Sequence, residues 1–147
     1  MSIFDRDEIG DKTAGGRGAW LTPGIYAIEI TRCSEGEGFK GPFAAVEGRV
    51  LEVLQEGPED SKAATLKPGT VVSWVCMLRN PSAWGDLKKF LAAAMGIDVS
   101  RVTNANARPN FEGDGTKLAG TTLVAQVHEK PTRTGGVFTI VNWFRPE

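Results

Sequence analysis

The sequence predicts an all-β domain with one helix, and three observations support this prediction. The first is the stretch 120–144, where the runs TTLVAQVHEK and VFTIVNWF flank the short loop PTRTGG. Runs rich in β-branched and aromatic residues around such a loop are typical of a long β-hairpin. The other two observations are three strand-like runs upstream and one stretch of helical periodicity. A hairpin is not stable alone, so it must pack against more sheet.

Length and charge narrow the class of protein. A chain of 147 residues forms, most simply, one domain with its own core. The net charge of −1 does not favour nucleic-acid binding, although it says nothing about how the charges are distributed. There is no N-terminal apolar run and no apolar segment of membrane-spanning length. We therefore expect a cytoplasmic protein without membrane contact.

Residues 1–19 differ in composition from the rest of the chain. They are charged and rich in glycine, which predicts a flexible N-terminal arm ahead of a folded domain at 20–147. An alternative is that Ile3 and Phe4 of this arm dock on a neighbouring subunit. That alternative would make the protein a homo-oligomer.

The first strand is expected at 20–33. After a Thr-Pro-Gly turn, Tyr26, Ile28 and Ile30 fall on one face and more polar residues on the other. This alternation is typical of a half-buried antiparallel strand. The Gly-rich stretch 34–42 is expected to be a loop.

Two further strands are expected before the helix. The second covers 43–55, where Gly48 suggests the bulge or bend that closing a barrel requires. After a polar loop at 57–67, the third strand covers 70–79. It is apolar on both faces, so we expect it at the centre of the sheet.

A helix follows, with clear signals at both ends. Asn80 is the expected N-cap, Pro81 the first helical residue and Gly96 the C-cap. Apolar residues between them recur at helical spacing and are assigned to the core-facing side: Trp84, Leu87, Phe90, Leu91, Ala94 and Met95. The polar stretch 98–119 is long and irregular, which is typical of a functional or disordered loop.

The order of these elements predicts a specific architecture. The chain is expected to form three strands, then a helix, then a closing hairpin. This is the order of the five-stranded Greek-key barrel called the OB-fold, in which the helix lies between strands three and four. A β-sandwich with an incidental helix is the alternative.

Catalytic and metal-binding patterns are missing from the sequence. The single histidine, His128, lies in a strand beside Glu129, and no G-x-S-x-G, GxGxxG or phosphate-binding loop motif is present. Cys33 and Cys76 lie in separate strands without a CxxC pair, so we expect buried thiols and no metal site. We predict a non-enzymatic protein with no cofactor. The alternative is an enzyme with an active site that forms only in the folded chain, from distant residues such as His128, Glu129 and Cys33.

Single-stranded nucleic-acid binding has better support in the sequence. It requires cations along a groove and exposed aromatic rings on which bases stack. In the last strand, Phe138 and Phe144 share one face and Trp143 the other, and alternation alone does not decide which face is exposed. Because Thr139 shares the face of Trp143, we favour Trp143 as exposed, and we assign Trp74 to the core. The candidate DNA-binding residues are Phe39, Lys40, Phe43, Arg49, Lys130, Arg133 and Trp143.

Four stretches between 21 and 144 carry a resemblance to a known family: LTPGIYAIEI, FKGPFAAVEGRVLEV, WGDLKKFLAAAMGI, and LAGTTLVAQVHEK with GGVFTIVNWF. Together they resemble the small phage-encoded single-stranded-DNA-binding proteins with an OB-fold, many of which are described only as a domain of unknown function. The resemblance implies binding of DNA replication or recombination intermediates, without sequence preference or catalysis, and replication or recombination proteins as partners. The chain departs from the pattern because it lacks an acidic C-terminal run and carries the stretch 98–119. The alternative function is a protein-interaction module, or a structural or accessory module, of a phage with no nucleic-acid binding.

Overall fold

A computed structural model describes residues 19–59, 64–135 and 137–146. The predicted N-terminal arm, apart from Ala19, lies outside these residues. The elements in chain order are β1 (Gly24–Gly38), β2 (Gly41–Glu56), β3 (Val71–Met77), α2 (Pro81–Met95), η1 (Val99–Arg101), α3 (Asn104–Ala107), η2 (Arg108–Phe111), β4 (Thr122–Pro131) and β5 (Val137–Phe144).

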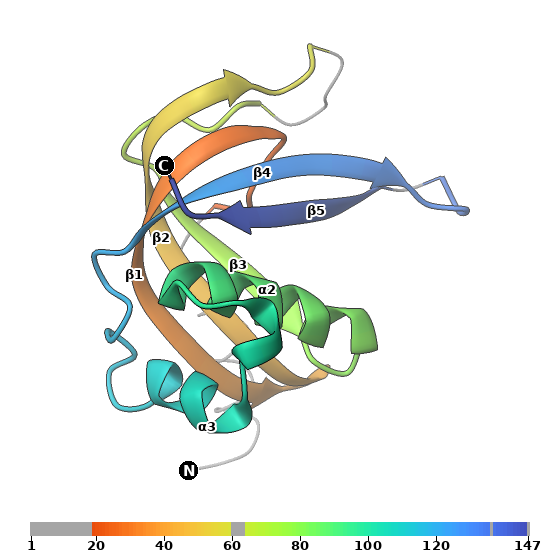
Figure 1. The fold of residues 1–147 in the computed structure, drawn as a ribbon. Coiled ribbons are helices and arrows are strands. Elements are labelled where there is room, and N and C mark those ends of the chain that lie inside the picture. Colours follow the sequence, from red (N-terminus) through yellow and green to blue (C-terminus); the bar gives the residue numbers. More distant parts are fainter. Residues whose placement is uncertain (1–18, 60–63, 136, 147) are drawn as a thin grey trace.

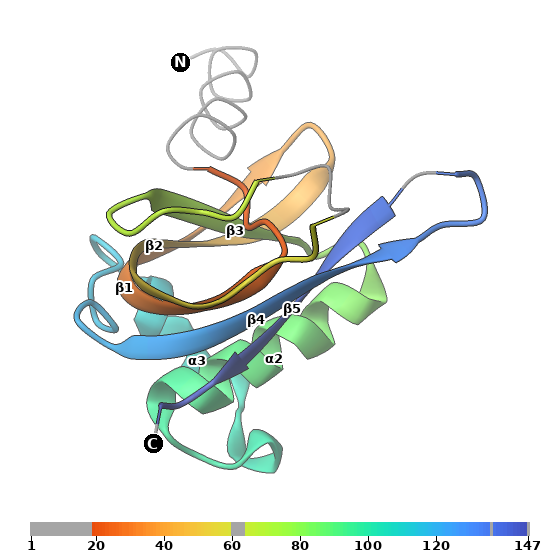
Figure 2. The same ribbon diagram turned by 90° about the horizontal axis from the view of Figure 1, so that it is seen from above.

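The strands form one antiparallel sheet in the order β3-β2-β1-β4-β5 (Figure 1). β1 is the shared strand, because its residues 24–29 pair with both β2 and β4 while the rest of it pairs with β2 alone. The sheet curls toward a barrel, but its end strands β3 and β5 form no ladder with each other in the described part of the chain (Figure 2). The prediction of an all-β fold with little helix is confirmed at this level.

Three aromatic rings join the two end strands where backbone hydrogen bonds do not. Trp74 of β3 and Trp143 of β5 have ring centroids 5.4 Å apart, and Phe90 of α2 lies 5.2 Å from Trp143 and 5.7 Å from Trp74. Edge-to-face and tilted arrangements of this kind are the favoured ones for aromatic pairs. The helix α2 therefore packs across the space between β3 and β5 and carries one of the three rings.

The first hairpin is longer than predicted, because the expected loop at 34–42 is mostly strand. Gly36 pairs with Phe43 of β2, and a Cβ at Gly36 would lie 2.9 Å from the Phe43 ring. Glycine therefore leaves room for that ring, and the connection shrinks to a turn of Phe39 and Lys40. Turn-forming residues can belong to strands when a close cross-strand contact favours them.

The prediction that the third strand is central is wrong, since β3 ends the sheet. On this strand Val72 is buried and Trp74 packs against α2, whereas Val71 is 43% exposed. The free edge of β3 bonds to Ala19, whose N–H donates to the Val71 carbonyl at 2.8 Å. Ala19 also accepts from the Ser73 N–H at 3.0 Å. These two hydrogen bonds pair backbone groups on the open edge of β3, where unpaired groups could otherwise bind another chain.

The predicted helix caps are confirmed. The Asn80 side chain accepts from the Ser82 N–H at 3.1 Å, and Gly96 ends the helix at φ 70°. Arg145 adds an unpredicted cap, donating to the Ala93 carbonyl at 3.0 Å, where a cation also suits the helix dipole. Trp84 is not a core residue, because it is 53% exposed while Ala83 is buried. A rotation of roughly 100° per residue puts Trp84 on the flank of the helix.

The stretch after the helix is compact in the structure. Asn110 is only 1% exposed, and its Nδ2 donates to the carbonyls of Asn106 at 3.2 Å and Ala107 at 3.1 Å. Farther along, the Gly115 carbonyl accepts from the Cys33 N–H at 2.8 Å, which ties the stretch to β1. These bonds join η2 to α3 and tie the stretch to β1.

Two glycines are expected to respond in opposite directions to an added methyl group. A Cβ at Gly48 would lie 2.8 Å from the Glu29 carbonyl oxygen and 2.7 Å from Ile28, whereas one at Gly85 of α2 would meet nothing within 4 Å. We expect Gly48→Ala to destabilise the fold by about 1–3 kcal/mol through overpacking. Gly85→Ala should stabilise it by about 0.5–1 kcal/mol through helix propensity. Urea denaturation of both variants measures the two signs, and a stabilised Gly48→Ala would contradict the close strand contact.

Candidate functional site

Trp143 is part of the core and not of a binding surface. Its side chain is 7% exposed and contacts the rings of Trp74 and Phe90. The expected exposure of Trp143 is therefore wrong, and the opposite face of β5 points outward. Phe138 and Phe144 on that face are 48% and 50% exposed.

The outward side of the β4–β5 hairpin forms one continuous surface, which we call the hairpin face. In the antiparallel register, residues directly opposite each other share a side of the sheet. The pairs on the hairpin face are Lys130 with Phe138, His128 with Ile140, Gln126 with Asn142, and Val124 with Phe144. The two phenylalanines are six positions apart, which is about 20 Å along a strand. The hairpin projects beyond the rest of the sheet in both views (Figures 1 and 2).

Cations accompany the rings on this hairpin. Lys130 lies directly opposite Phe138, and Arg133 lies in the turn beyond it. Both side chains are exposed, and neither forms a hydrogen bond or ion pair with any residue that the structure describes. The hairpin face therefore offers ring surface and uncommitted positive charge at its outer end.

The β1–β2 turn holds the second group of predicted residues. Phe39 is 79% exposed and Lys40 beside it is exposed too. Phe43 is half-buried, because its ring packs over Gly36. This turn lies at a different corner of the molecule from the tip of the hairpin face (Figures 1 and 2). The fold does not bring the two groups of predicted residues together into one cluster.

Arg49 belongs to neither group. It lies on the outer side of β2, exposed, with Glu29 of β1 directly opposite. Cross-strand neighbours of this kind are close enough for the carboxylate to offset the positive charge of the guanidinium. The outer wall around Arg49 therefore carries charges of both signs, and its contribution to anion binding is reduced.

One signal in the sequence could have identified the correct face of β5. Trp143 lies opposite Ala125 of β4, between the buried residues Leu123 and Val127. A large ring beside a small side chain is how facing positions in a core fill space. The PTRTGG turn sets which residues are opposite each other, so counting back from it pairs Trp143 with Ala125 and leaves Phe138 and Phe144 outside.

The cysteines offer no reactive group, as their predicted burial implies. Cys33 and Cys76 are 1% and 4% exposed, and burial raises the pKa of each thiol to about 12 from 9.0, with smaller contributions from Glu47 and Asp86 respectively. Among the described residues, no group of three or more His, Cys, Asp or Glu side chains could hold a metal ion.

We expect both thiols of the folded protein to resist a thiol-specific disulfide reagent at pH 8, and to react fully in urea. Because the raised pKa belongs to the folded state, the thiols support stability below about pH 9, and this support is lost as the pH rises toward 12. Timed absorbance measurements of thiol labelling check this expectation. Rapid labelling of the folded chain would contradict the burial of both cysteines.

The sequence matches no protein-family model and no curated protein. Within residues 19–59, 64–135 and 137–146, no helix combines the length and apolar character needed to cross a membrane. The candidate site therefore stands on its own geometry, which is an aromatic and cationic strip on a projecting hairpin.

Proposed function

We propose that this protein binds single-stranded DNA, largely without sequence preference, through the hairpin face. The observation that carries the proposal is the exposure of Phe138 and Phe144 on one side of a projecting hairpin, with Lys130 and Arg133 at its outer end. Exposed rings stack on any base, and exposed cations hold the phosphate backbone. These are the two requirements of a sequence-tolerant single-strand binder.

The proposal includes a finer description of the fold. The strand order β3-β2-β1-β4-β5 with α2 between β3 and β4 is compatible with a Greek-key OB-fold whose last closure is made by side chains. We propose that the ring cluster of Trp74, Phe90 and Trp143 takes the place of the missing β3–β5 ladder. With the resemblance in sequence, this supports a phage protein of DNA replication or recombination.

The division of roles follows from exposure. Phe138 and Phe144 stack on bases, Lys130 and Arg133 hold phosphates, and Phe39 with Lys40 offers a second contact when the strand is long enough to reach the other turn. Trp143 has no direct role because it is buried. Arg49 contributes little because Glu29 is opposite.

Fluorescence-anisotropy titration with a labelled oligo-dT tests the proposal. We expect saturable binding in the micromolar range at low salt. With about three phosphate contacts, from Lys130, Arg133 and Lys40, the slope of log K against log salt should be roughly −2 for a single strand. An unlabelled oligo-dC of equal length should compete about as well as oligo-dT. No saturable binding at low salt would overturn the proposal.

A second candidate function is a protein-interaction module. The observation in its favour is that β5 ends the sheet, so its outer edge is available for an added strand from a partner. Light scattering after size exclusion, on the full chain and on one lacking residues 1–18, distinguishes the two functions when combined with the titration. An oligomer without DNA binding would favour the interaction module.

A further inference from the structure

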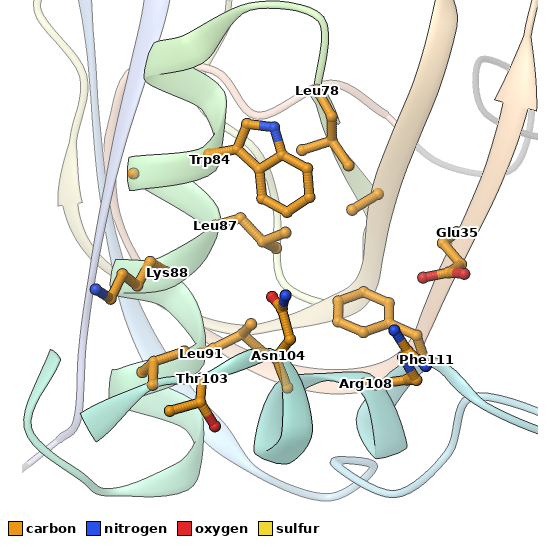
Figure 3. Close-up of a pocket in the computed structure, with 14 residues that line it drawn as sticks. Glu35, Leu78, Trp84, Leu87, Lys88, Leu91, Thr103, Asn104, Arg108 and Phe111 are labelled. Atoms are coloured by element: carbon orange, nitrogen blue, oxygen red, sulfur yellow. The ribbon is translucent and has the colours of Figure 1, made fainter. Parts of the chain in front are cut away.

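A pocket separate from the hairpin face lies between α2, the short helices α3 and η2, and the far part of the β1–β2 hairpin (Figure 3). Its volume is about 580 Å³. Pockets that hold small ligands have volumes of about 300–1,000 Å³, with apolar linings and a few convergent polar groups. The floor here is apolar and includes Leu78, Leu87 and Leu91.

Two aromatic rings stand at the sides of this pocket. Trp84 reaches in from the first part of α2, and Phe111 from the end of η2, so the indole and the phenyl ring lie on different walls of the cavity (Figure 3). Trp84 is 53% exposed, although an indole of that size usually finds cover. The flank of α2 therefore presents an uncovered ring to whatever enters the pocket.

The polar groups in the pocket are uncommitted. The Asn104 side chain points into the cavity below Trp84, and Arg108 lies beside Phe111 (Figure 3). Lys88 also lines the pocket, but its ammonium group extends from α2 on the side away from Trp84 (Figure 3). None of these three side chains makes a hydrogen bond or an ion pair with the part of the chain that the structure describes. The carboxylate of Glu35 lies at the same end as Arg108.

We propose that this pocket binds a single nucleotide, with its base in contact with Trp84 and Phe111 and its phosphate held by a cation at the edge. A planar base suits the ring walls, and an amide such as that of Asn104 can both donate to and accept from a base edge. Glu35 only accepts hydrogen bonds, so it favours a base that carries an amino group. The guanidinium of Arg108, which lies beside Phe111, is the cation placed to hold the phosphate. The proposal does not depend on DNA binding at the hairpin face.

Titration of the ¹⁵N-labelled protein with dAMP, followed by amide and side-chain NMR shifts, tests this site. We expect saturable shifts of the Trp84 indole and the Asn104 side-chain amide, and weaker binding of dTMP and of deoxyadenosine without phosphate. Trp84→Ala should weaken dAMP binding roughly 5- to 150-fold, the range for loss of one stacking ring. Trp20→Ala is the matched control, because Trp20 is 60% exposed and lies outside the pocket.

A second pair of variants tests which cation holds the phosphate. Arg108→Gln should weaken dAMP binding, whereas Arg101→Gln should not, because Arg101 is exposed and outside the pocket. No saturable shifts with dAMP, or equal binding by Trp84→Ala, would overturn the site. NMR shifts of the pocket residues that change with protein concentration, and not with dAMP, would show that a second copy of the chain occupies the pocket. That result would also overturn the proposed nucleotide site. Thymine carries no amino group, so we expect oligo-dT to bind at the hairpin face and not in this pocket. The oligo-dT titration therefore tests the hairpin face separately from the dAMP titration of the pocket.

Discussion

Trp143→Ala is expected to destabilise the protein by about 3–5 kcal/mol, the range for removing a large aromatic side chain from a core. The ring is 7% exposed and contacts both Trp74 and Phe90, so its loss opens a cavity where the end strands β3 and β5 meet. No backbone ladder joins these two strands in the described part of the chain. Urea denaturation followed by far-UV circular dichroism measures the change.

Two further variants make this prediction specific. Trp143→Phe keeps a ring in place and removes an indole N–H that has no hydrogen-bond acceptor among the described residues, so the loss should be below about 1.5 kcal/mol. Phe144→Ala removes a half-exposed ring from the other face and should cost much less than Trp143→Ala. If Phe144→Ala were the more destabilising of the two alanine variants, the assignment of faces on β5 would be wrong.

The double variant Phe138→Ala/Phe144→Ala is expected to lose most of its affinity for oligo-dT. Each stacked base contributes about 1–3 kcal/mol, so the loss of both rings corresponds to roughly 30-fold or more in the dissociation constant. The same variant should unfold at nearly the same urea concentration as the unchanged protein, because both side chains are about half exposed. Anisotropy titration at low salt measures the affinity.

Leu54→Ala is the control for this experiment. Leu54 is 47% exposed on β2, so the substitution also removes an exposed apolar side chain, but one away from the hairpin face. We expect its affinity for oligo-dT to stay unchanged. Equal losses in the control and the double variant would point to a general loss of apolar surface, and not to stacking at Phe138 and Phe144.

Local signals in the sequence were sufficient for the helix and the hairpin. Asn80, Pro81 and Gly96 predict the ends of α2 because caps depend on the residues at the helix ends alone. The PTRTGG loop predicts the connection between β4 and β5 for the same reason. The burial of Cys33 and Cys76 was predictable because both lie in expected strands and free cysteine is among the most buried residue types.

The misplaced features depend on contacts between distant parts of the chain. Trp84 fits the helical period, yet in the described part of the chain its side of α2 borders a pocket, so it is exposed. Trp143 has a polar neighbour, Thr139, on its own face, yet it is buried. The small Ala125 lies opposite it on β4, and its ring packs against Phe90 of α2. Arg49 has a carboxylate residue, Glu29, directly opposite it, which only the pairing of β1 with β2 reveals. Alternation identifies the two faces of a strand but not which one is covered.

The central claim is that the hairpin face binds single-stranded DNA, and mapping of amide NMR shifts during titration with oligo-dT tests it most directly. The account predicts shifts concentrated at the outward pairs of β4 and β5, from Val124 to Lys130 and from Phe138 to Phe144, with little change at the Trp143 indole. Shifts confined to another part of the surface, or no shifts at saturating oligo-dT, would contradict it.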